Sequence, residues 1–399
     1  MATQVNDSHD SDVSLLTIFS KFNSDTTDSV ILDKARELCA EYLGGVWGQI
    51  DSTQLKLKRM SGGLTNLVFS CELPANVRPI ASEPRIVLLR IQTQSDSLQL
   101  TREVAIMMNL NAHGFGPKLL AIFPGGRIEE FIPSRNLTKE ESLDKNFIRN
   151  IAKLTAEIND VDMPLPKSPQ FVTLVRSWLT KCRKLGFKSL PMERTCVHEE
   201  FPAVVTIDDL EKELDEIDAF MKAQKGPSVF CHNDIVPSNV LVKTGVDGEE
   251  ESFDYDRLVI IDFEFAIYNL RGMEIGNAMA EFGMKYGLEK PPHYDTDLTM
   301  MTEDELSTTY CEAYLDQLYK DHDTPEKRKQ NLLTGDRQKD LEMLRSEGRR
   351  FLALPHFFWG IWNIICMEEL EGSFEFGYVP HAKDRLIMYY RFKENMYKY

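Results

Sequence analysis

Two polar loops, each bordered by an apolar run, constrain the fold of this chain more than any other feature. The first loop carries three polar residues in close succession: His232, Asp234 and Asn239. The apolar run 240–242 follows this loop, and a second run, 258–261, leads to Asp262. Short apolar runs bounded by polar residues predict strands, and the acidic stretch 244–256 between them predicts the tip of a hairpin. Such a hairpin would bring the two loops together, so we expect two carboxylates and an amide to meet.

The spacing of these polar residues matches the H-x-D-x-x-x-x-N pattern of a kinase catalytic loop. In that pattern the Asp accepts the proton of the attacking hydroxyl, the Asn holds Mg²⁺, and a second metal-binding Asp follows later in the chain. The pattern therefore predicts phosphoryl transfer, with Asp234 as the base and Asn239 and Asp262 beside the metal. The alternative is that His232 and Asp234 form only a turn and a cap and that Asp262 ends a strand. That alternative requires three placements to coincide by accident.

The composition argues against several classes of function. The net charge of −17 over 399 residues argues against a general nucleic-acid binder, because such a protein needs a surplus of Lys and Arg. The same charge disfavours docking on anionic membranes. The seven cysteines are scattered without a C-x-x-C pair, as expected for thiols in a reducing compartment. Residues 1–12 lack the apolar core of a signal peptide. The apolar segment 351–367 is shorter than the ~20 residues of a membrane span, so we expect a buried helix there.

The order of the expected elements divides the chain into two lobes. We expect a loose tail at 1–25, a nucleotide-binding lobe with a small sheet at 26–133, and a larger, mainly helical catalytic and substrate-binding lobe at 134–399. In the first lobe, periodicity predicts helices at 30–42 and 101–110 and strands at 55–60, 67–73, 85–91 and 127–132. In the second lobe, it predicts helices near 148–158, 171–179, 207–221, 276–286, 302–319 and 339–370.

A glycine-containing segment and a basic residue are candidates for holding phosphate. The segment 61–66, Ser-Gly-Gly-Leu-Thr-Asn, lies between two expected strands. Glycines there let backbone N–H groups approach phosphate oxygens, although two glycines between strands usually form only a hairpin. The third strand carries Arg90 where the kinase pattern has a Lys, and the next helix offers Glu103 in the place of its partner. Arg can grip phosphate with two parallel hydrogen bonds; the alternative is that both residues are ordinary surface charges.

Four further motifs stand beside the two loops: Tyr268–Gly272, Gly276–Asn277, Trp359–Trp362 and Gly372–Tyr378. Together with the loops they make the chain resemble the choline/ethanolamine kinases from about Ser61 to Arg391. The resemblance implies a two-lobed, protein-kinase-like α+β fold and the ATP- and Mg²⁺-dependent phosphorylation of choline to phosphocholine, the first step of phosphatidylcholine synthesis. It also implies a cytoplasmic homodimer that acts on choline or ethanolamine, with no nucleic-acid partner and no stable membrane insertion.

The resemblance also assigns roles by position. Asp234 would be the base, and Asn239 and Asp262 would hold Mg²⁺. Glu264 would lie in the same metal site. The residues implied for ATP are Gly62, Gly63, Leu64, Thr65, Asn66, Arg90, Glu130 and Ile132. Three positions depart from the family pattern and bear on the pocket rather than on the reaction: Ser238 in place of Gly, and Phe265 and His381 each in place of Tyr.

The expected amine pocket follows from the chemistry of a quaternary ammonium. This group has no N–H to donate, so a protein holds it through ring faces and diffuse negative charge. Trp359 and Trp362 lie three apart on an expected helix and therefore share one face. The candidate pocket residues are Phe265, Glu281, Tyr286, Trp359, Trp362 and Phe376. The alternative is that the two tryptophans simply pack in the core, as aromatic residues at helical spacing more often do.

Three rival functions remain at this point. An ethanolamine-preferring kinase is one, because a polar His381 would favour a primary amine. Phe265 argues against it, since this residue lacks a hydroxyl that could accept a hydrogen bond from a primary ammonium. An aminoglycoside phosphotransferase is another, but its polyamine sugars require an acidic pocket, which a pair of tryptophans fits less well. A pseudokinase scaffold is the third, and the intact Asp234, Asn239 and Asp262 argue against it. A protein kinase is disfavoured because Asp-Phe-Glu at 262–264 replaces D-F-G.

Overall fold

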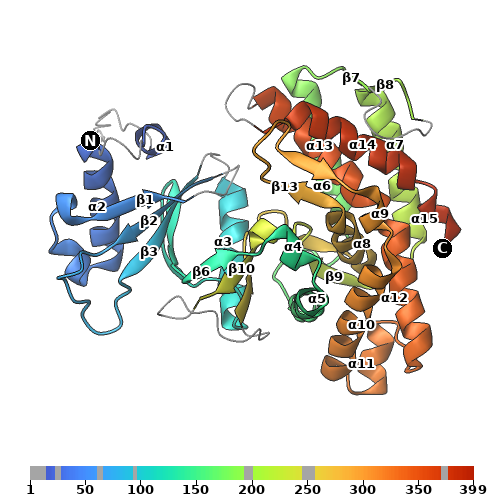
Figure 1. Ribbon diagram of the computed structural model, residues 1–399, viewed down its shortest axis with the longest axis horizontal. Helices are drawn as coiled ribbons and strands as arrows, with labels where there is room; N and C mark the ends of the chain where they lie inside the picture. The colour runs from blue at the N-terminus through green and yellow to red at the C-terminus, as the bar shows by residue number, and fades with distance from the viewer. Residues whose placement is uncertain are drawn as a thin grey trace, which may run out of the picture. The chain divides into compact units, whose positions relative to one another are not determined.

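The chain forms two compact units in a computed structural model, and the division follows Pro133. The first unit comprises Met1–Pro133 and the second Ser134–Tyr399 (Figure 1). The division falls where the end of the first lobe is expected from the sequence. The residues described by the structure are 15–22, 28–60, 66–92, 97–192, 201–244, 257–369 and 376–399.

The first unit is built on an antiparallel five-stranded sheet in the order β1-β2-β3-β5-β4. Its strands are β1 (Lys56–Arg59), β2 (Asn66–Glu72), β3 (Ile86–Gln92), β4 (Leu119–Phe123) and β5 (Gly126–Glu130). Its helices are α1 (Leu15–Phe19), α2 (Ser29–Leu43) and α3 (Ser97–Ala112). The expected helices and strands are confirmed, and β4 is an addition that the sequence analysis missed.

Helix α1 lies inside the segment expected to be a loose tail. It is ordered because Phe19 is fully buried and its ring lies 5.2 Å from that of Phe69 on β2. Helix α2 begins where the Asp28 side chain accepts from the Val30 amide, which satisfies one of the free donors of the first turn. Gly44, at a φ of 69°, ends the helix in a conformation that favours glycine.

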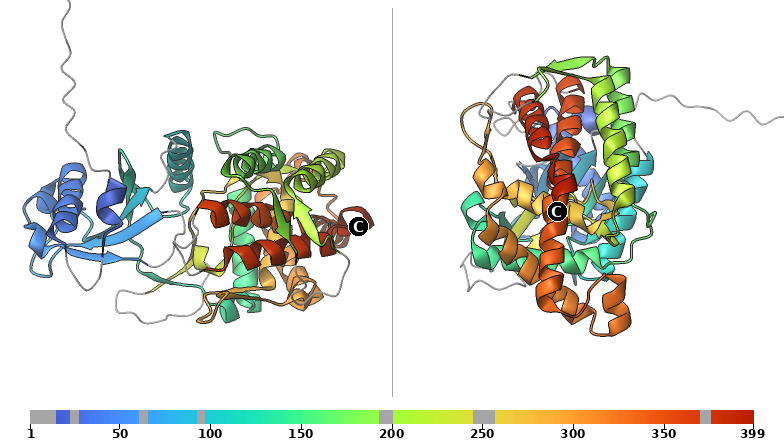
Figure 2. Two further views of the ribbon diagram at one scale, coloured as in Figure 1. Left: turned by 90° about the horizontal axis from the view of Figure 1, so that it is seen from above. Right: turned by 90° about the vertical axis from the view of Figure 1, so that its right-hand side faces the viewer.

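The second unit is mainly helical, with four small sheets (Figure 2). Its helices are α4 (Lys139–Ser142), α5 (Lys145–Asn159), α6 (Phe171–Leu185), α7 (Ile207–Ala223), α8 (Arg271–Phe282), α9 (Leu298–Met301), α10 (Asp304–Asp321), α11 (Pro325–Gln330), α12 (Arg337–Phe351), α13 (Ala353–Glu369), α14 (Tyr378–Phe392) and α15 (Asn395–Lys398). Its strands are β6 (Ser134–Asn136), β7 (Ser189–Pro191), β8 (Val204–Thr206), β9 (Ser228–Cys231), β10 (Val240–Lys243), β11 (Leu258–Ile260), β12 (Ile267–Leu270), β13 (Met284–Tyr286) and β14 (Tyr294–Thr296). The two-lobed α+β architecture expected from the sequence is therefore confirmed.

Two expected helices of this unit differ from the structure. The helix expected at 276–286 spans Arg271–Phe282, and Tyr286 instead lies on β13. The reason is Gly283, where an added Cβ would lie 2.4 Å from the Asp297 carbonyl oxygen. Because glycine has no side chain, the backbone after β14 can lie against Gly283, and β13 pairs with β14. The single helix expected at 339–370 is two helices, α12 and α13, which meet at Leu352.

The long apolar stretch of α12 and α13 packs inside the unit. The segment Arg337–Glu369 is long and apolar enough to cross a membrane by length and composition alone, but 83% of its most apolar window is buried within the protein. The buried helix expected at 351–367 is confirmed. Close contact with α8 explains the burial, because a Cβ on Gly276 would lie 2.9 Å from the backbone of Phe351.

Candidate active site

The two polar loops meet as the sequence predicts. Strands β10 and β11 pair antiparallel, with Val240 opposite Ile260. Beyond the last pair, the Ile261 amide donates to the Asn239 carbonyl oxygen at 3.0 Å. The hairpin thereby fixes the end of the first loop against the start of the second. The tip expected between them, 245–256, lies outside the described residues.

Asp234 and Asn239 are held together within the first loop. The side-chain nitrogen Nδ2 of Asn239 donates to the Asp234 carboxylate oxygen Oδ2 at 2.8 Å and to the Asp234 backbone carbonyl oxygen at 3.0 Å. Because the amide nitrogen faces Asp234, the Asn239 oxygen Oδ1 is directed away from it. Asp262 adopts a φ of +67°, a left-handed conformation that is uncommon for a residue other than glycine and often marks a functional site.

Asp234 lies in strongly negative surroundings. Burial raises the pKa of its carboxyl well above the ordinary value, and the charges of Glu281, Asp262 and Glu264 raise that pKa further, while the hydrogen bond from Asn239 opposes them. Three other carboxylates therefore act on the charge of Asp234. An arrangement of this kind attracts cations, because a positive charge relieves the repulsion among the carboxylates.

His232 connects the two loops rather than acting on a substrate. Its ring nitrogen Nε2 lies 3.0 Å from the Ile261 carbonyl oxygen, and its Nδ1 accepts from the Asp234 amide at 3.2 Å. Burial lowers the pKa of His232 to about 4, so the ring is neutral near pH 7 and one nitrogen can donate while the other accepts. Its ring also lies 4.5 Å from that of Phe263.

A residue that the sequence analysis missed, Glu274 on α8, anchors the backbone of the first loop. Its carboxylate accepts from the His232 amide at 2.5 Å and from the Asn233 amide at 3.1 Å. It also accepts from the Asn159 side chain at 3.2 Å, and the Tyr314 hydroxyl donates to Asn159 at 2.7 Å. Burial raises the pKa of Glu274 to about 7.

The oxygen atoms beside Asp234 suit a magnesium ion. Within the described ranges, His, Cys, Asp and Glu residues do not gather in groups of three or more that could hold a metal. Mg²⁺ does not require such a group, since it is usually bound by one or two carboxylates together with waters and phosphate oxygens. Asp262, Glu264 and the amide oxygen of Asn239 are hard oxygen donors of the kind that Mg²⁺ prefers.

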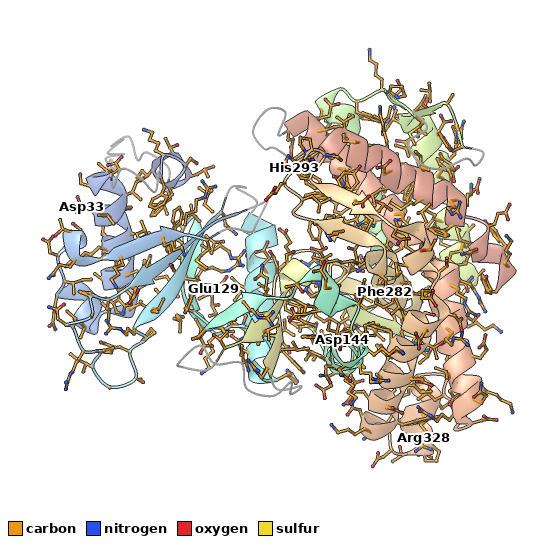
Figure 3. All side chains as sticks on the ribbon, in the orientation of Figure 1. Asp33, Glu129, Asp144, Phe282, His293 and Arg328 are labelled. Carbon is orange, nitrogen blue, oxygen red and sulfur yellow. The ribbon has the colours of Figure 1, made fainter. Side chains whose placement is uncertain are left out.

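The first unit contains a cluster of buried charges around Glu129, which is labelled in Figure 3. Arg90 donates to the Glu129 carboxylate at 3.0 Å. Arg127 donates to the same oxygen of Glu129 at 2.6 Å and to Glu103 at 2.7 Å. All four side chains are at least nine-tenths buried. The expected partners Arg90 and Glu103 thus belong to one cluster, and Arg127 and Glu129 connect them.

The remaining residues implied for ATP are only partly described. Gly62, Gly63, Leu64 and Thr65 lie outside the described residues. Asn66 begins β2, where its backbone pairs opposite Gln92. Glu130 ends β5, and its amide donates to the Lys118 carbonyl oxygen at 2.8 Å. Ile132 follows β5 and is half-buried.

The expected amine-pocket residues form a continuous group of aromatic rings in the second unit. The Phe265 ring lies 5.1 Å from that of Trp359 and 5.8 Å from that of Trp362, and the two tryptophan rings lie 5.6 Å apart. All three pairs meet edge to face, which is a favourable geometry. Tyr378 extends the group, with its ring 6.3 Å from Trp362 and 5.1 Å from Phe376.

The backbone of Phe265 contacts the catalytic loop. The Asn233 side chain, next to Asp234, donates to the Phe265 carbonyl oxygen at 3.0 Å. Trp359 is buried, whereas Phe265 and Trp362 are half-exposed. Phe265 and Trp362 therefore keep part of their surface exposed while they pack, like Trp359, against the core of this unit.

Glu281, expected to add negative charge to the pocket, is paired inside the protein. Its Oε1 accepts from Arg385 at 2.6 Å, while its Oε2 is buried without a hydrogen-bond partner in the part of the chain that the structure describes. Lys139 donates to the carbonyl oxygens of Glu281 and Phe282 at 2.9 and 2.7 Å and so caps the end of α8. Arg385 also donates to the hydroxyl of Tyr286, which joins that expected pocket residue to the same cluster.

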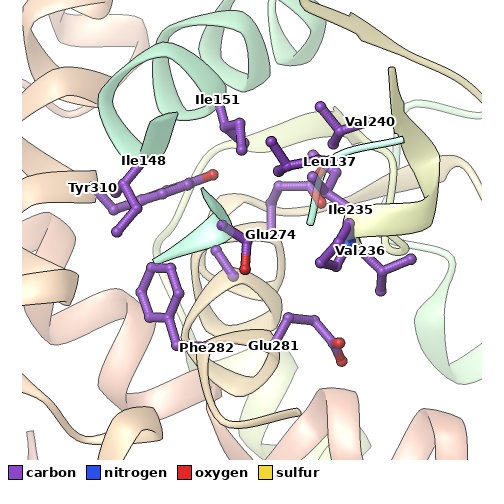
Figure 4. A pocket seen from close by; sticks show the side chains of 13 residues that line it. Leu137, Ile148, Ile151, Ile235, Val236, Val240, Glu274, Glu281, Phe282 and Tyr310 are labelled. Atoms are coloured by element: carbon purple, nitrogen blue, oxygen red, sulfur yellow. The ribbon is translucent and has the colours of Figure 1, made fainter. Parts of the chain in front are cut away.

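A small cavity of about 40 Å³ lies on the inner side of the catalytic loop (Figure 4). Glu274 and Glu281 line it together with apolar side chains: Leu137, Ile148, Ile151, Ile235, Val236 and Phe282. Its volume admits about one or two waters, which is too small for a nucleotide or an amine substrate. This cavity is therefore not the substrate site.

Comparison with known proteins agrees with this geometry. Residues 57–390 match the family described as choline/ethanolamine kinase. A choline/ethanolamine kinase of Rattus norvegicus is 32% identical over 90% of this chain and 86% of its own length. Choline kinase A2 of Caenorhabditis elegans is 30% identical over 91% of this chain and 86% of its own. A solved structure of a Plasmodium vivax ethanolamine kinase covers 95% of this chain and 94% of its own, with a TM-score of 0.68 and 17% identity, which shows the shared fold.

The match spans both compact units and includes the catalytic loop, the anchoring helix and the aromatic group. The chain therefore belongs to the choline/ethanolamine kinase family.

Proposed function

We propose that this protein transfers the γ-phosphoryl group of ATP to the hydroxyl of choline, with Mg²⁺, to give phosphocholine. The observation that carries the proposal is the contact between Asn233 and Phe265 at 3.0 Å. This hydrogen bond, from the Asn233 side chain to the Phe265 carbonyl oxygen, supports a candidate base, Asp234, near an aromatic group that could hold an ammonium without hydrogen bonds.

Asp234 would act as the proton acceptor. The choline oxygen forms a bond to the γ-phosphorus while the bond to the ADP oxygen breaks, and the hydroxyl proton passes to the Asp234 carboxylate. The raised pKa of Asp234 makes its carboxylate a stronger base than an ordinary Asp. A bound cation offsets the negative surroundings and keeps the carboxyl ionised before the transfer.

The oxygens of Asn239, Asp262 and Glu264 would hold Mg²⁺ near Asp234, and the ion would neutralise charge on the phosphates. In the first unit, Arg90 and the segment 62–66 would hold the ATP phosphates, and the backbone near Glu130 and Ile132 would meet the adenine. The support for Arg90 is its fixed position on β3, since Glu129 accepts from its Nε at 3.0 Å and so orients the guanidinium.

The aromatic group favours choline over ethanolamine. Ethanolamine carries three N–H donors and is strongly hydrated, so ring faces replace its water poorly. Choline presents methyl groups and a diffuse charge, which Phe265, Trp359 and Trp362 can surround at little cost in desolvation.

A preference for ethanolamine is the second candidate. The observation in its favour is the polar residue His381, whose ring lies 5.2 Å from that of Phe376 in the group of aromatic residues. A further point is that one structural neighbour is described as an ethanolamine kinase.

We further infer a cytoplasmic enzyme of phospholipid synthesis that works as a homodimer without inserting into a membrane. The described cysteines are free and buried, as in a reducing compartment: Cys39, Cys71, Cys182, Cys231, Cys311 and Cys366. Analytical ultracentrifugation of the purified chain would test the dimer, and a sedimentation coefficient typical of a 45.8 kDa monomer would contradict it.

A turnover assay with ATP and Mg²⁺ tests the proposed function. Choline, ethanolamine and an aminoglycoside are offered separately, and ADP release is measured together with the phosphorylated product. We expect the highest kcat/KM for choline, a lower value for ethanolamine and no product from the aminoglycoside. Turnover confined to the aminoglycoside would overturn the proposal.

A further inference from the structure

Two neighbouring residues of the catalytic loop, His232 and Asn233, contact the second loop through their side chains. The His232 ring nitrogen Nε2 lies 3.0 Å from the Ile261 carbonyl oxygen. The Asn233 side chain donates to the Phe265 carbonyl oxygen at 3.0 Å. Both residues are fully buried. The two contacts therefore lie on either side of the segment 262–264, which carries the proposed metal carboxylates.

The place of Asn233 follows from the pairing of β9 with β12. Cys231 and Ile267 lie opposite each other at one end of this antiparallel pair. Extended by two residues, the same register places Asn233 opposite Phe265. The backbone of Asn233 leaves the ladder at this point, because its φ is +64° and its amide donates to Glu274 at 3.1 Å. The side chain, rather than the backbone amide, therefore donates across to the opposite segment.

An asparagine meets both requirements of this position. A positive φ is uncommon for residues other than glycine, and Asn is among those that tolerate it best. Its side-chain nitrogen carries two hydrogens, and it donates to the carbonyl oxygens of Phe265 and, at 3.2 Å, of Cys231. A glycine here would keep the backbone turn but lose both donors. An aspartate would place a carboxylate against two carbonyl oxygens.

We propose that Asn233 is a positioning residue for the metal carboxylates Asp262 and Glu264, because its side chain holds one end of the segment that carries them. The inference rests on the proposed function and deepens it. His232 holds the other end of the segment. With both ends fixed in advance, less conformational freedom is lost when an ion binds, and residues that orient metal ligands in this way raise the affinity of the site.

Electron paramagnetic resonance of Mn²⁺ tests the proposal without turnover. Mn²⁺ prefers oxygen ligands as Mg²⁺ does, and the signal of the free ion falls as the ion binds. The chain is titrated with Mn²⁺ in the presence of ADP, with ADP alone as the blank. In Asn233→Gly the dissociation constant for Mn²⁺ should rise about tenfold, the lower end of the usual effect of losing a residue that orients a metal ligand. An unchanged constant would overturn the proposal.

Asn111→Ala in the first unit is a matched control. The Asn111 side chain also donates to two carbonyl oxygens, those of Phe115 and Pro117, at 3.1 and 2.7 Å. The thermal midpoint measured without metal should fall in both variants, because each loses a bridge of the same kind. The dissociation constant for Mn²⁺ should rise only in Asn233→Gly. An equal rise in both variants would assign the effect to a general loss of stability and overturn the proposal.

The same titration separates this inference from the proposed function. A wild-type chain that binds no Mn²⁺ with ADP would contradict the proposed function, and the inference would fail with it. A wild-type chain that binds Mn²⁺, together with an Asn233→Gly variant of equal affinity, would overturn the inference alone.

Hydrogen–deuterium exchange of the wild type shows whether the segment is held before metal binds. The Ala266 amide donates to the Phe263 carbonyl oxygen at 3.1 Å, and the Ile261 amide is bonded to the catalytic loop. We expect the peptide covering 261–266 to exchange slowly without metal and little more slowly with Mg²⁺ and ADP. In metal-free Asn233→Gly the same peptide should exchange faster. Fast exchange in the wild type that becomes slow only with Mg²⁺ and ADP would overturn the proposal. Should the variant not fold, this wild-type result decides.

Discussion

Buried charges of opposite sign pair with one another in the first unit, whereas several carboxylates act on Asp234 in the second. In the first unit, Arg90, Arg127 and Glu129 on the sheet pair with one another and with Glu103 on α3. In the second unit, Glu281 has Arg385 as its partner, yet it still acts with Asp262 and Glu264 to raise the pKa of Asp234.

This difference teaches what each cluster requires. A balanced cluster of buried ions is satisfied by the fold alone. The carboxylates around Asp234 raise its pKa, and the two cations of the proposed reaction, Mg²⁺ and the substrate ammonium, would oppose that effect. The following predictions test the contrast, beginning with the largest effect.

Removing a proposed metal carboxylate should have the largest effect on activity. Asp262→Ala should abolish turnover of choline at ordinary Mg²⁺ concentrations, because charge on the transferring phosphoryl group would no longer be neutralised. Steady-state turnover across a Mg²⁺ titration is the measurement. A variant that works normally at ordinary Mg²⁺ would show that Asp262 is not a metal ligand.

Asp234→Asn should remove the proton acceptor without changing the shape of the site. We expect kcat to fall by ~10²–10⁴-fold, the usual contribution of a general base. The thermal midpoint should not fall. Because the folded-state pKa of Asp234 is raised, its contribution to stability is present at acid pH and lost as pH rises through that pKa. Near-normal turnover, or clear destabilisation at neutral pH, would contradict this reading.

Substitutions in the charge cluster of the first unit should change the free energy of unfolding rather than turnover. Arg127→Met leaves Glu103 and Glu129 with less compensation in a buried setting. Breaking a buried ion pair on one side typically costs ~3–5 kcal/mol. Denaturant unfolding would measure the loss, with the exposed Arg78→Met as the control. Equal midpoints for the two variants would contradict a structural role for this cluster.

Glu274 links stability to pH. Its pKa is raised from 4.5 to about 7, so between these values the folded state holds a proton that the unfolded chain releases. The associated stability is present below about pH 4.5 and lost as pH rises through about 7, with a total on the order of 3 kcal/mol. Unfolding measured from pH 5 to 8 should show this fall in the wild type and a flatter profile in Glu274→Gln. Parallel profiles would exclude Glu274 as the source.

The smallest effect concerns the rings. Trp359→Ala or Trp362→Ala should weaken choline binding by ~0.5–2 kcal/mol per lost cation–π contact. The loss should appear mainly in KM, because ring contacts hold the ground and transition states alike. Ethanolamine should lose less than choline. An unchanged KM for choline in both variants would assign the tryptophans to core packing.

The catalytic loop was predictable because its chemistry is local. His232, Asp234 and Asn239 lie in one short stretch with strands around it, and the hairpin that joins the stretch to Asp262 was evident from apolar runs. The aromatic group was predictable only with the family resemblance, since Phe265 and Trp359 meet through tertiary contacts that periodicity does not reveal.

The supporting residues could not be predicted for a related reason. Glu274 and Arg385 look like ordinary charges on amphipathic helices, and only the packing of α8 and α14 turns them inward. Tyr286 was assigned to a helix because the close approach at Gly283 is a long-range contact. A single sequence shows which residues can do chemistry, but not which buried partners position them.

Internal competition between the two amines tests the central claim most directly. Choline and ethanolamine are mixed at equal concentration with limiting enzyme, ATP and Mg²⁺, and the two phosphorylated products are quantified early in the reaction. Their ratio reports the relative kcat/KM without separate kinetics. If ring faces and surplus carboxylates define the cation site, phosphocholine will be in excess. An excess of phosphoethanolamine would contradict that account of the pocket.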